Sequence, residues 1–226
     1  MKKQVLIIGL GRFGVSLATT LFSMGHDVMA LDEDEKKVQN VSAHITHAVQ
    51  ADATDEAVLR ELGVSNFDVA IVTVGQAIQN SVLSTILLKK LGVPYVIARA
   101  ENDLHGTILD KIGADKVVYP EREMGIRVAH GLTLTDVQDY IPVAPNYGVS
   151  KLATSPYFVG KSLSDIGLGR GGKWGLAVLL IRRGKEVIVT PDRAEVVRSG
   201  DVLIVSGNDE KLEQFMAETK KQKEEG

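Results

Sequence analysis

The residues with the clearest chemical potential form a glycine-rich loop near the N-terminus. Gly9, Gly11 and Gly14 follow the spacing G-x-G-x-x-G, directly after a short apolar run. Between a strand and a helix, the first glycine permits a tight turn, the second lets backbone approach a phosphate, and the third allows close helix–strand packing. Unpaired N–H groups and the dipole at the helix start then attract an anion. The loop therefore predicts a phosphate-binding site.

Two charged residues extend this prediction. Asp32 ends the second expected strand, where a carboxylate accepts hydrogen bonds from ribose hydroxyls and repels a 2′-phosphate, which disfavours NADP. Arg12, inside the loop, offers a guanidinium that binds phosphate oxygens bidentately and suits a ligand with a further phosphate. The alternatives are that the glycines mark only a tight turn, that Asp32 caps a helix, and that Arg12 faces solvent.

Further polar residues follow the later expected strands, whose carboxyl ends meet at one crevice in an open α/β sheet. These candidates are Asp52, Ala53, Thr54, Val74, Gly75, Arg99 and His105. Thr54 is expected to cap a helix, and Asp52 could do the same. A lone histidine is more often a packing or surface residue than a ligand, so packing is the alternative for His105.

The hydrophobic pattern predicts the scaffold that positions these residues. The expected strands are Val5–Ile8, Val28–Leu31, His47–Gln50, Asp68–Thr73, Tyr95–Arg99 and Lys116–Tyr119. The expected helices between them are Arg12–Met24, Asp34–Val41, Thr54–Leu62, Ile78–Leu91 and Asn102–Ile112. Because parallel neighbours need crossover helices, the fold class is α/β, a Rossmann-like doubly wound parallel sheet.

The pattern changes after Pro120. Residues 121–141 are expected to form one long or broken helical region without a strand, and the prolines in 142–146 suggest a boundary. The strands expected beyond it are Val149–Thr154, Ala177–Arg182, Val187–Val189 and Val202–Ser206. A final helix is expected from Asp209 to about Thr219, with Leu212, Phe215 and Met216 as its apolar face. The charged tail, residues 220–226, is expected to fray. The expected domains are 1–140 and a smaller α+β domain, 141–226.

Composition narrows the class of function. The chain of 226 residues has a net charge of −3 with acids and bases interspersed, which gives no reason to expect nucleic-acid binding. It has no cysteine, so disulfides, thiolate metal sites and cysteine nucleophiles are excluded. The sequence predicts neither a signal peptide nor a stretch of about 18 apolar residues that could span a membrane. We therefore expect a soluble chain whose membrane role requires a partner.

Several segments together resemble the RCK domain (regulator of K⁺ conductance), as found in the cytosolic subunit of bacterial Ktr and Trk potassium-uptake systems. The segments that carry the resemblance are 5–14, 31–32, 52–54, 74–75, 109–115 and 120–121. The C-terminal part is similar to the smaller RCK C-lobe (TrkA-C type), through 161–163 and 199–203. The resemblance covers the whole chain.

The resemblance implies a nucleotide ligand, ATP or ADP, with NAD or NADH as the alternative. By matching positions, the phosphate residues would be Gly9, Gly11, Arg12 and Gly14, with Phe13 and Thr54 in the same binding set. Asp32 would hold the ribose, Asp52, Ala53, Val74 and Gly75 would line the adenine side, and Arg99 and His105 would lie at the rim. Glu121 would face the terminal phosphates and could hold Mg²⁺ or Ca²⁺; its alternative role is a first-turn acid favoured by the helix dipole.

The resemblance also implies a homodimer that assembles into an octameric ring beneath an integral-membrane K⁺ transporter subunit. The chain would be cytoplasmic and peripheral to the inner face of the membrane. Relatives that bind cyclic di-AMP differ from this chain in the glycine-rich segment 167–173, so no second-messenger site is carried over.

The main alternative is an NAD-dependent oxidoreductase, since the first domain would serve either role. Such an enzyme needs a second domain with an acid–base group, yet all five histidines, at 26, 44, 47, 105 and 130, precede residue 142. A P-loop lysine is also missing. The sequence thus predicts a non-enzymatic binding module, with a purely structural oligomer as a third possibility.

Overall fold

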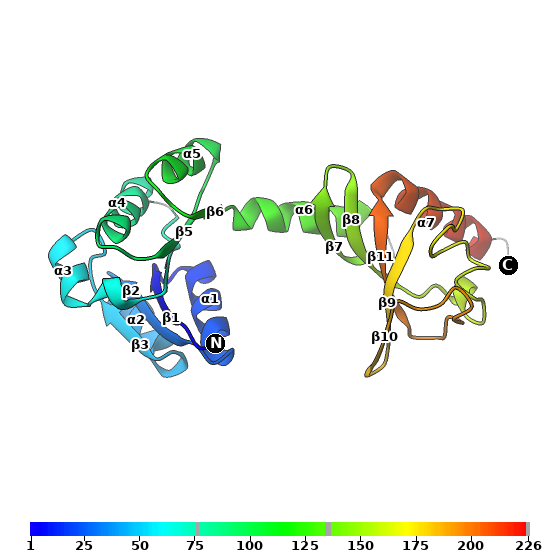
Figure 1. Cartoon of the computed structure of the whole chain (residues 1–226), viewed down its shortest axis with the longest axis horizontal. Helices are drawn as coiled ribbons and strands as arrows, with labels where there is room; N and C mark the ends of the chain where they lie inside the picture. Colours follow the sequence, from blue (N-terminus) through cyan, green and yellow to red (C-terminus); the bar gives the residue numbers. More distant parts are fainter. Residues whose placement is uncertain (76, 134–136, 225–226) are drawn as a thin grey trace. The chain divides into compact units, whose positions relative to one another are not determined.

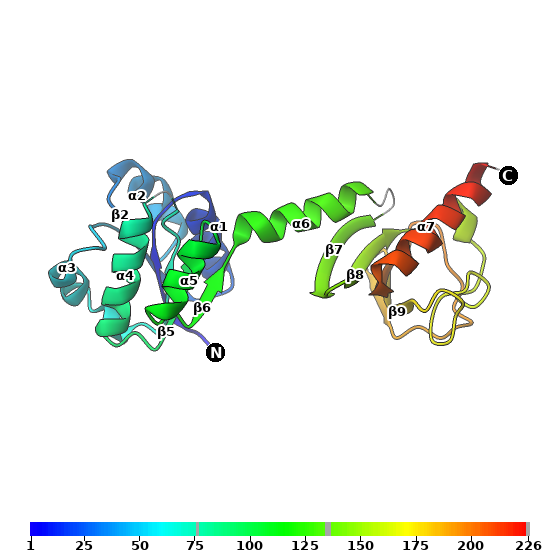
Figure 2. The same cartoon turned by 90° about the horizontal axis from the view of Figure 1, so that it is seen from above.

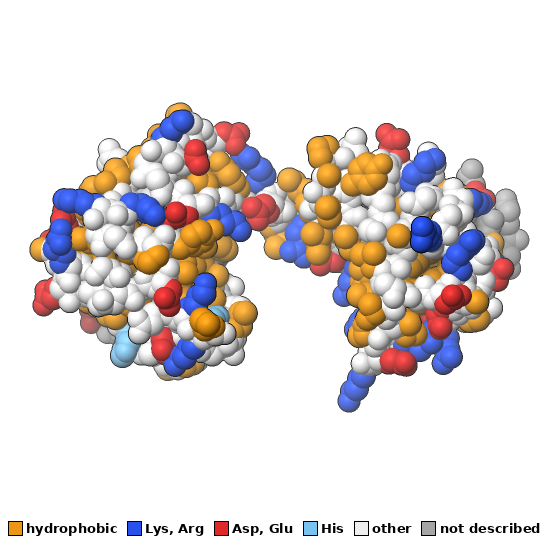
Figure 3. Space-filling view, viewed as in Figure 1, with side chains coloured by type: hydrophobic (Ala, Val, Ile, Leu, Met, Phe, Trp, Pro, Cys, Tyr) orange, Lys and Arg blue, Asp and Glu red, His pale blue; other side chains and the backbone are white. Residues whose placement is uncertain are grey.

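The computed structural model describes residues 1–75, 77–133 and 137–224. The chain divides into two compact units, Met1–Pro120 and Glu121–Gly226, each built around its own sheet (Figure 1). Lysines, arginines and acidic residues are interspersed on the face of each unit that Figure 3 shows. None of the helices formed by the described residues has the length and hydropathy of a membrane span.

The first unit contains a six-stranded sheet in the order β3-β2-β1-β4-β5-β6. The strands are β1 Gln4–Ile8, β2 Asp27–Asp32, β3 His47–Gln50, β4 Val69–Val72, β5 Tyr95–Arg99 and β6 Lys116–Val118. Every pair of neighbours is parallel. This confirms the predicted Rossmann-like sheet, and its strand order reverses between β1 and β4, where ligands bind in such folds.

Helices cover both faces of this sheet. They are α1 Arg12–Ser23, α2 Glu35–Val41, α3 Glu56–Glu61, α4 Ile78–Lys90 and α5 Asp103–Lys111. Along β1, Val5 and Ile7 pack in one apolar cluster with Ala18 of α1, whereas Leu6 and Ile8 pack in another with Leu88 of α4. Figure 2 shows α4 and α5 side by side. Burial on both faces explains the short, fully apolar strand.

The start of α3 differs from the prediction. Its N-cap is Asp55, whose Oδ1 accepts hydrogen bonds from the backbone N–H of Ala57 at 2.8 Å and of Val58 at 3.4 Å. Thr54 was expected to be the cap, and this prediction is wrong. The two residues are both good caps, and Asp55 takes the role because Thr54 bonds to Asp52 instead.

The second unit contains a five-stranded antiparallel sheet in the order β10-β9-β11-β8-β7, which confirms the predicted α+β character. Its elements are α6 Pro120–Thr133, β7 Val137–Ala144, β8 Tyr147–Ala153, β9 Ala177–Arg183, β10 Glu186–Val189, β11 Val202–Asn208 and α7 Asp209–Glu224. As predicted, Leu212, Phe215 and Met216 of α7 are buried in the core. The helix continues to Glu224, beyond the expected end at Thr219.

One expectation about residues 121–146 is corrected. The helical region was predicted to reach Ile141 without a strand, but β7 begins at Val137. The segment 142–146, whose prolines suggested a boundary, lies in the hairpin of β7 and β8, with Asn146 in a left-handed conformation (φ 58°). Pro142 is tolerated because β7 is an edge strand, where the missing N–H breaks no ladder.

Candidate functional site

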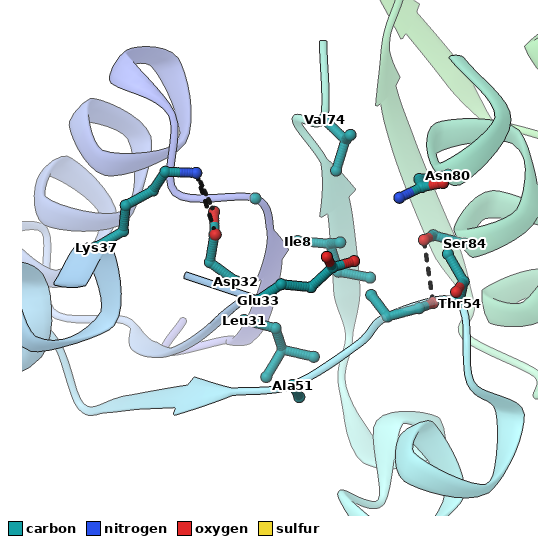
Figure 4. A pocket seen from close by; sticks show the side chains of 12 residues that line it. Ile8, Leu31, Asp32, Glu33, Lys37, Ala51, Thr54, Val74, Asn80 and Ser84 are labelled. Carbon is teal, nitrogen blue, oxygen red and sulfur yellow. Dashed lines mark hydrogen bonds and ion pairs between the residues drawn. The ribbon is translucent and has the colours of Figure 1, made fainter. Parts of the chain in front are cut away.

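A pocket of about 180 Å³ opens in the first unit where β1, β2 and β4 end (Figure 4). It lies at the point where the strand order reverses between β1 and β4. Its lining residues are Ile8, Gly9, Leu31, Asp32, Glu33, Lys37, Ala51, Ala53, Thr54, Val74, Asn80 and Ser84. The pocket is therefore where an open α/β sheet is expected to hold its ligand.

Two glycines of the loop are required by the backbone around them. Gly9 has φ +99°, and its carbonyl oxygen accepts a hydrogen bond of 2.7 Å from the hydroxyl of Thr73. A Cβ on Gly14 would overlap that same carbonyl oxygen. Gly9 therefore makes the turn and Gly14 lets α1 pack against it.

The start of α1 is open to an external acceptor. A Cβ on Gly11 would have no heavy atom within 4 Å, and Gly11 caps α1 without a side-chain hydrogen bond. The first N–H groups of the helix therefore remain for another partner. Arg12 is exposed and has no hydrogen bond or ion pair within the described part of the chain, while Phe13 is half-buried. This arrangement of amides and a guanidinium suits a phosphate group.

Asp32 is fixed at the edge of the pocket. Its Oδ2 accepts a hydrogen bond from the N–H of Leu10 at 2.7 Å, and its Oδ1 accepts one from the N–H of Asp34 at 2.9 Å. The Lys37 Nζ lies 3.1 Å from Oδ1 and 3.2 Å from Oδ2. Burial raises the pKa of Asp32, but these hydrogen bonds and the Lys37 charge lower it more, so the net pKa is below its ordinary value of 3.8. The group is thus an anionic acceptor at neutral pH.

The predicted Asp52 shapes the loop after β3. Thr54 donates to its Oδ1 from the backbone N–H at 2.7 Å and from the hydroxyl at 2.6 Å. These bonds hold the pKa of Asp52 below its ordinary value. Ala53 and Thr54 line the pocket, whereas Asp52 does not. The carbonyl of Ala53 is in turn held by the Ser84 hydroxyl at 3.0 Å, which fixes α4 to the loop.

Arg99 and His105 do not line this pocket. The guanidinium of Arg99 lies against Gly75, where any Cβ would overlap it. His105 is only 1% exposed; its Nδ1 accepts a hydrogen bond from the N–H of Glu101 at 3.3 Å, and its Nε2 has no partner among the described residues. Burial lowers the pKa of His105, with the charge of Glu101 opposing and that of Arg99 reinforcing the shift. The structure thus buries His105 instead of exposing it at a rim.

Glu121 is an exposed residue in the first turn of α6, in the second compact unit. The described residues contain no group of three or more His, Asp or Glu side chains that could hold a metal ion. Because Mg²⁺ and Ca²⁺ take six or more oxygen ligands, one carboxylate does not form such a site by itself. The predicted role of Glu121 therefore stays a prediction, and no step is assigned to a cation.

Several pocket residues were not among the sequence candidates. They are Ile8, Leu31, Glu33, Lys37, Ala51, Asn80 and Ser84. Asn80 and Ser84 are four residues apart on α4, so they share a face of that helix. That spacing was a usable signal, because α4 follows the strand next to the glycine loop. The predicted residues Gly11, Arg12, Phe13, Gly14 and Gly75 do not line the pocket; the first four follow its lining residue Gly9 in the loop and at the start of α1, and Gly75 follows Val74.

Two family models match the chain. The TrkA-N domain model matches residues 5–120, and the TrkA-C domain model matches residues 149–220. Residues 121–148 belong to neither match. The predicted division at 140/141 therefore stays a prediction.

Two curated proteins of Bacillus subtilis (strain 168) are similar over nearly their whole length. The Ktr system potassium uptake protein C is 42% identical over 215 residues, which cover 95% of this chain and 96% of the relative. The Ktr system potassium uptake protein A is 37% identical over 213 residues, with 94% and 95% covered.

Solved structures share the fold at low identity. The crystal structure of the GsuK RCK domain has a TM-score of 0.63 at 19% identity and covers 94% of this chain and 46% of its own. The GsuK channel bound to NAD has a TM-score of 0.64 at 20% identity and covers 96% of this chain and 40% of its own. These two matches show the RCK fold for both units.

Proposed function

The chain belongs to the family of RCK proteins with a TrkA-N and a TrkA-C domain, and from this premise we propose that it is the nucleotide-binding regulatory subunit of a Ktr-type potassium-uptake system. The observation that carries the proposal is the pocket beside the Gly9 turn, with the fixed carboxylate of Asp32 at its edge. The full-length relatives are named as potassium uptake proteins and not as enzymes, which supports a regulatory role without catalysis.

The ligand is an adenosine nucleotide, ATP or ADP, with NAD or NADH as the alternative. Its phosphates lie at the open start of α1, near Gly11 and Arg12, and its ribose hydroxyls donate to Asp32. The base enters the part of the pocket lined by Ala53 and Val74. The GsuK channel, a protein of the same fold, has been solved bound to NAD, which is a ligand of this class.

The proposed mechanism is linkage between nucleotide and assembly. The chain forms dimers within an octameric ring and acts from the cytoplasmic side on an integral-membrane K⁺ transporter subunit. A nucleotide shifts the shape of such a ring only if it binds the two shapes with different affinity, and coupling of about 1–3 kcal/mol is usual. ATP and ADP differ by one charged phosphate, and the Arg12 guanidinium, unpaired within the described part of the chain, is positioned to sense it.

Thermal unfolding of the purified chain with ATP, ADP, NAD⁺, NADH and cyclic di-AMP tests the proposal. We expect at least one adenosine nucleotide to raise the melting temperature by mass action, and the Asp32→Asn variant to lose most of that shift. Size-exclusion chromatography in the presence of each nucleotide then reports the oligomeric state. A chain that binds none of the first four compounds would refute the proposal, and steady oxidation of NADH by an added ketone would favour the oxidoreductase.

A further inference from the structure

The pocket has two walls of different chemistry. Asp32 and Lys37 form an ion pair on one wall, and Thr54, Asn80 and Ser84 stand on the other, beyond the apolar floor (Figure 4). A ribose at Asp32 would direct its base toward the wall that carries Asn80. Polar groups on an otherwise apolar wall usually fix the orientation of a ligand.

The hydrogen-bonding capacity of that second wall is concentrated in one side chain. The Thr54 hydroxyl donates to Asp52, and the Ser84 hydroxyl donates to the carbonyl of Ala53. Asn80 has no hydrogen-bond partner among the described residues, although its amide offers two N–H donors and one carbonyl acceptor. Asn80 is thus the side chain there with both functions available.

Asn80 is also held in place by the fold. It lies in the first turn of α4 and is half-buried, one helical turn before Ser84. The Ser84 bond to the Ala53 carbonyl ties this part of α4 to the loop that lines the pocket. An amide on a fixed helix, beside the apolar side chains of Ala53 and Val74, suits a flat base that presents a donor next to an acceptor.

We propose that Asn80 is a specificity-determining residue that reads the 6-amino edge of an adenine base, an inference that rests on the proposed function. Adenine presents its amino donor beside a ring-nitrogen acceptor, which an asparagine amide matches bidentately. The amide alone could rotate to match a 6-oxo purine. Glu33 resolves this ambiguity, because its carboxylate lines the same pocket and extends toward the wall of Thr54 in Figure 4, where it accepts from an amino group and repels an oxo group.

A cycle of two changes, one in the protein and one in the base, tests this contact. Calorimetry would compare wild type and Asn80→Leu with ADP, purine riboside 5′-diphosphate, which lacks the 6-amino group, and inosine 5′-diphosphate. We expect wild type to lose about 25-fold in affinity when the amino group is removed, as for two net hydrogen bonds, one to Asn80 and one to Glu33. Asn80→Leu should bind ADP about fivefold more weakly and lose only about fivefold on the same change of base, because the contact with Glu33 remains.

The matched control is Gln79→Leu, which removes an exposed amide from the same helix outside the pocket and should behave as wild type. Asn80→Ser serves as a second variant, with a side chain too short to reach the base, in case Asn80→Leu does not fold. If wild type and both Asn80 variants lose the same factor in affinity when the 6-amino group is removed, the inference is overturned, while the proposal of nucleotide binding remains. If wild type binds no adenosine nucleotide, the proposed function fails and this inference fails with it.

Discussion

Two carboxylates, one in each unit, are held in similar ways but in different surroundings. Asp32 accepts from the backbone N–H of Leu10 and pairs with Lys37, whose side chain is 45% exposed. Asp201 is 0% exposed and accepts two hydrogen bonds from Arg183, at 3.0 and 2.9 Å. The Asp32 pair can open to admit a ligand, because its cation is already in solvent. The Asp201 pair is shielded from solvent on both sides, which is typical of a pair that stabilises the fold.

The comparison predicts its largest effect at Asp201. Burial raises the pKa of Asp201, but the hydrogen bonds from Arg183 and from the backbone N–H of Arg198, together with the two arginine charges, lower it more. Asp201→Ala removes two hydrogen bonds of a largely buried guanidinium, which keeps Glu195 and the Val196 carbonyl, so we expect the free energy of unfolding to fall by about 3 kcal/mol. Urea denaturation measures this. Asp32→Asn is the matched variant, and a loss of stability as large as that of Asp201→Ala would contradict the comparison.

The next largest effect is a difference in stability between alanine variants of two glycines in the same loop, Gly14 and Gly11. A Cβ on Gly14 would overlap the carbonyl of Gly9, so Gly14→Ala should cost about 1–3 kcal/mol of unfolding free energy and should also weaken nucleotide binding. Gly11→Ala meets open space and should leave stability nearly unchanged. Thermal unfolding of the two variants, with and without ADP, checks this. Equal destabilisation would show that the open space at Gly11 is filled.

A smaller effect is expected at Arg12, the exposed cation of the loop. Arg12→Ala should leave the unfolding free energy within about 0.5 kcal/mol of wild type, because the guanidinium has no partner in the described part of the chain. It should weaken ATP binding by about tenfold, and ADP binding by less, because a charge-assisted hydrogen bond to the extra phosphate is lost. Calorimetry measures the affinity of the variant for both nucleotides. Equal losses of ATP and ADP affinity would count against a role of Arg12 in sensing the extra phosphate.

The smallest effect concerns pH. The pKa of Asp32 lies below its ordinary 3.8, so its contribution to stability is present above that pH and is lost as the pH falls through the folded-state pKa. Lys37→Ala removes one cause of the shift and should cost at most about 1 kcal/mol at pH 7, because Lys37 is partly exposed. Melting temperatures from pH 7 to about pH 3 should converge for the variant and wild type. A gap that widens toward acid would contradict this sign.

Local patterns predicted most of the first unit. Short apolar runs such as Val5–Ile8, followed by helical spacing and glycine, identified six strands near their observed bounds. The glycine loop and Asp32 were found because their roles depend on local sequence. The cap of α3 was misplaced by one residue, since Thr54 and Asp55 are both capping types and only the Thr54–Asp52 bond separates them.

Features that depend on distant packing could not be predicted. The strand β7 was missed because Val137–Ala144 contains a proline, and only its edge position in the sheet makes that residue acceptable. Burial of His105 depends on how α5 packs, and local sequence carries no sign of it. Asn80 belongs to no motif; its spacing from Ser84 indicates a shared helix face, but only the structure shows that this face lies over the loop that Ser84 holds.

Side chains along β1 alternate between the two faces of the sheet, so the number of residues in this strand is fixed as well as their type. Leu6 and Ile8 face one core, and Val5 and Ile7 face the other, with Gly9 directly after them. Deleting a single residue would exchange the side chains between the two cores and draw the phosphate loop inward by about 3.3 Å. The strand has no spare position to absorb such a shift. Evolution can therefore vary the types of these side chains far more readily than their number.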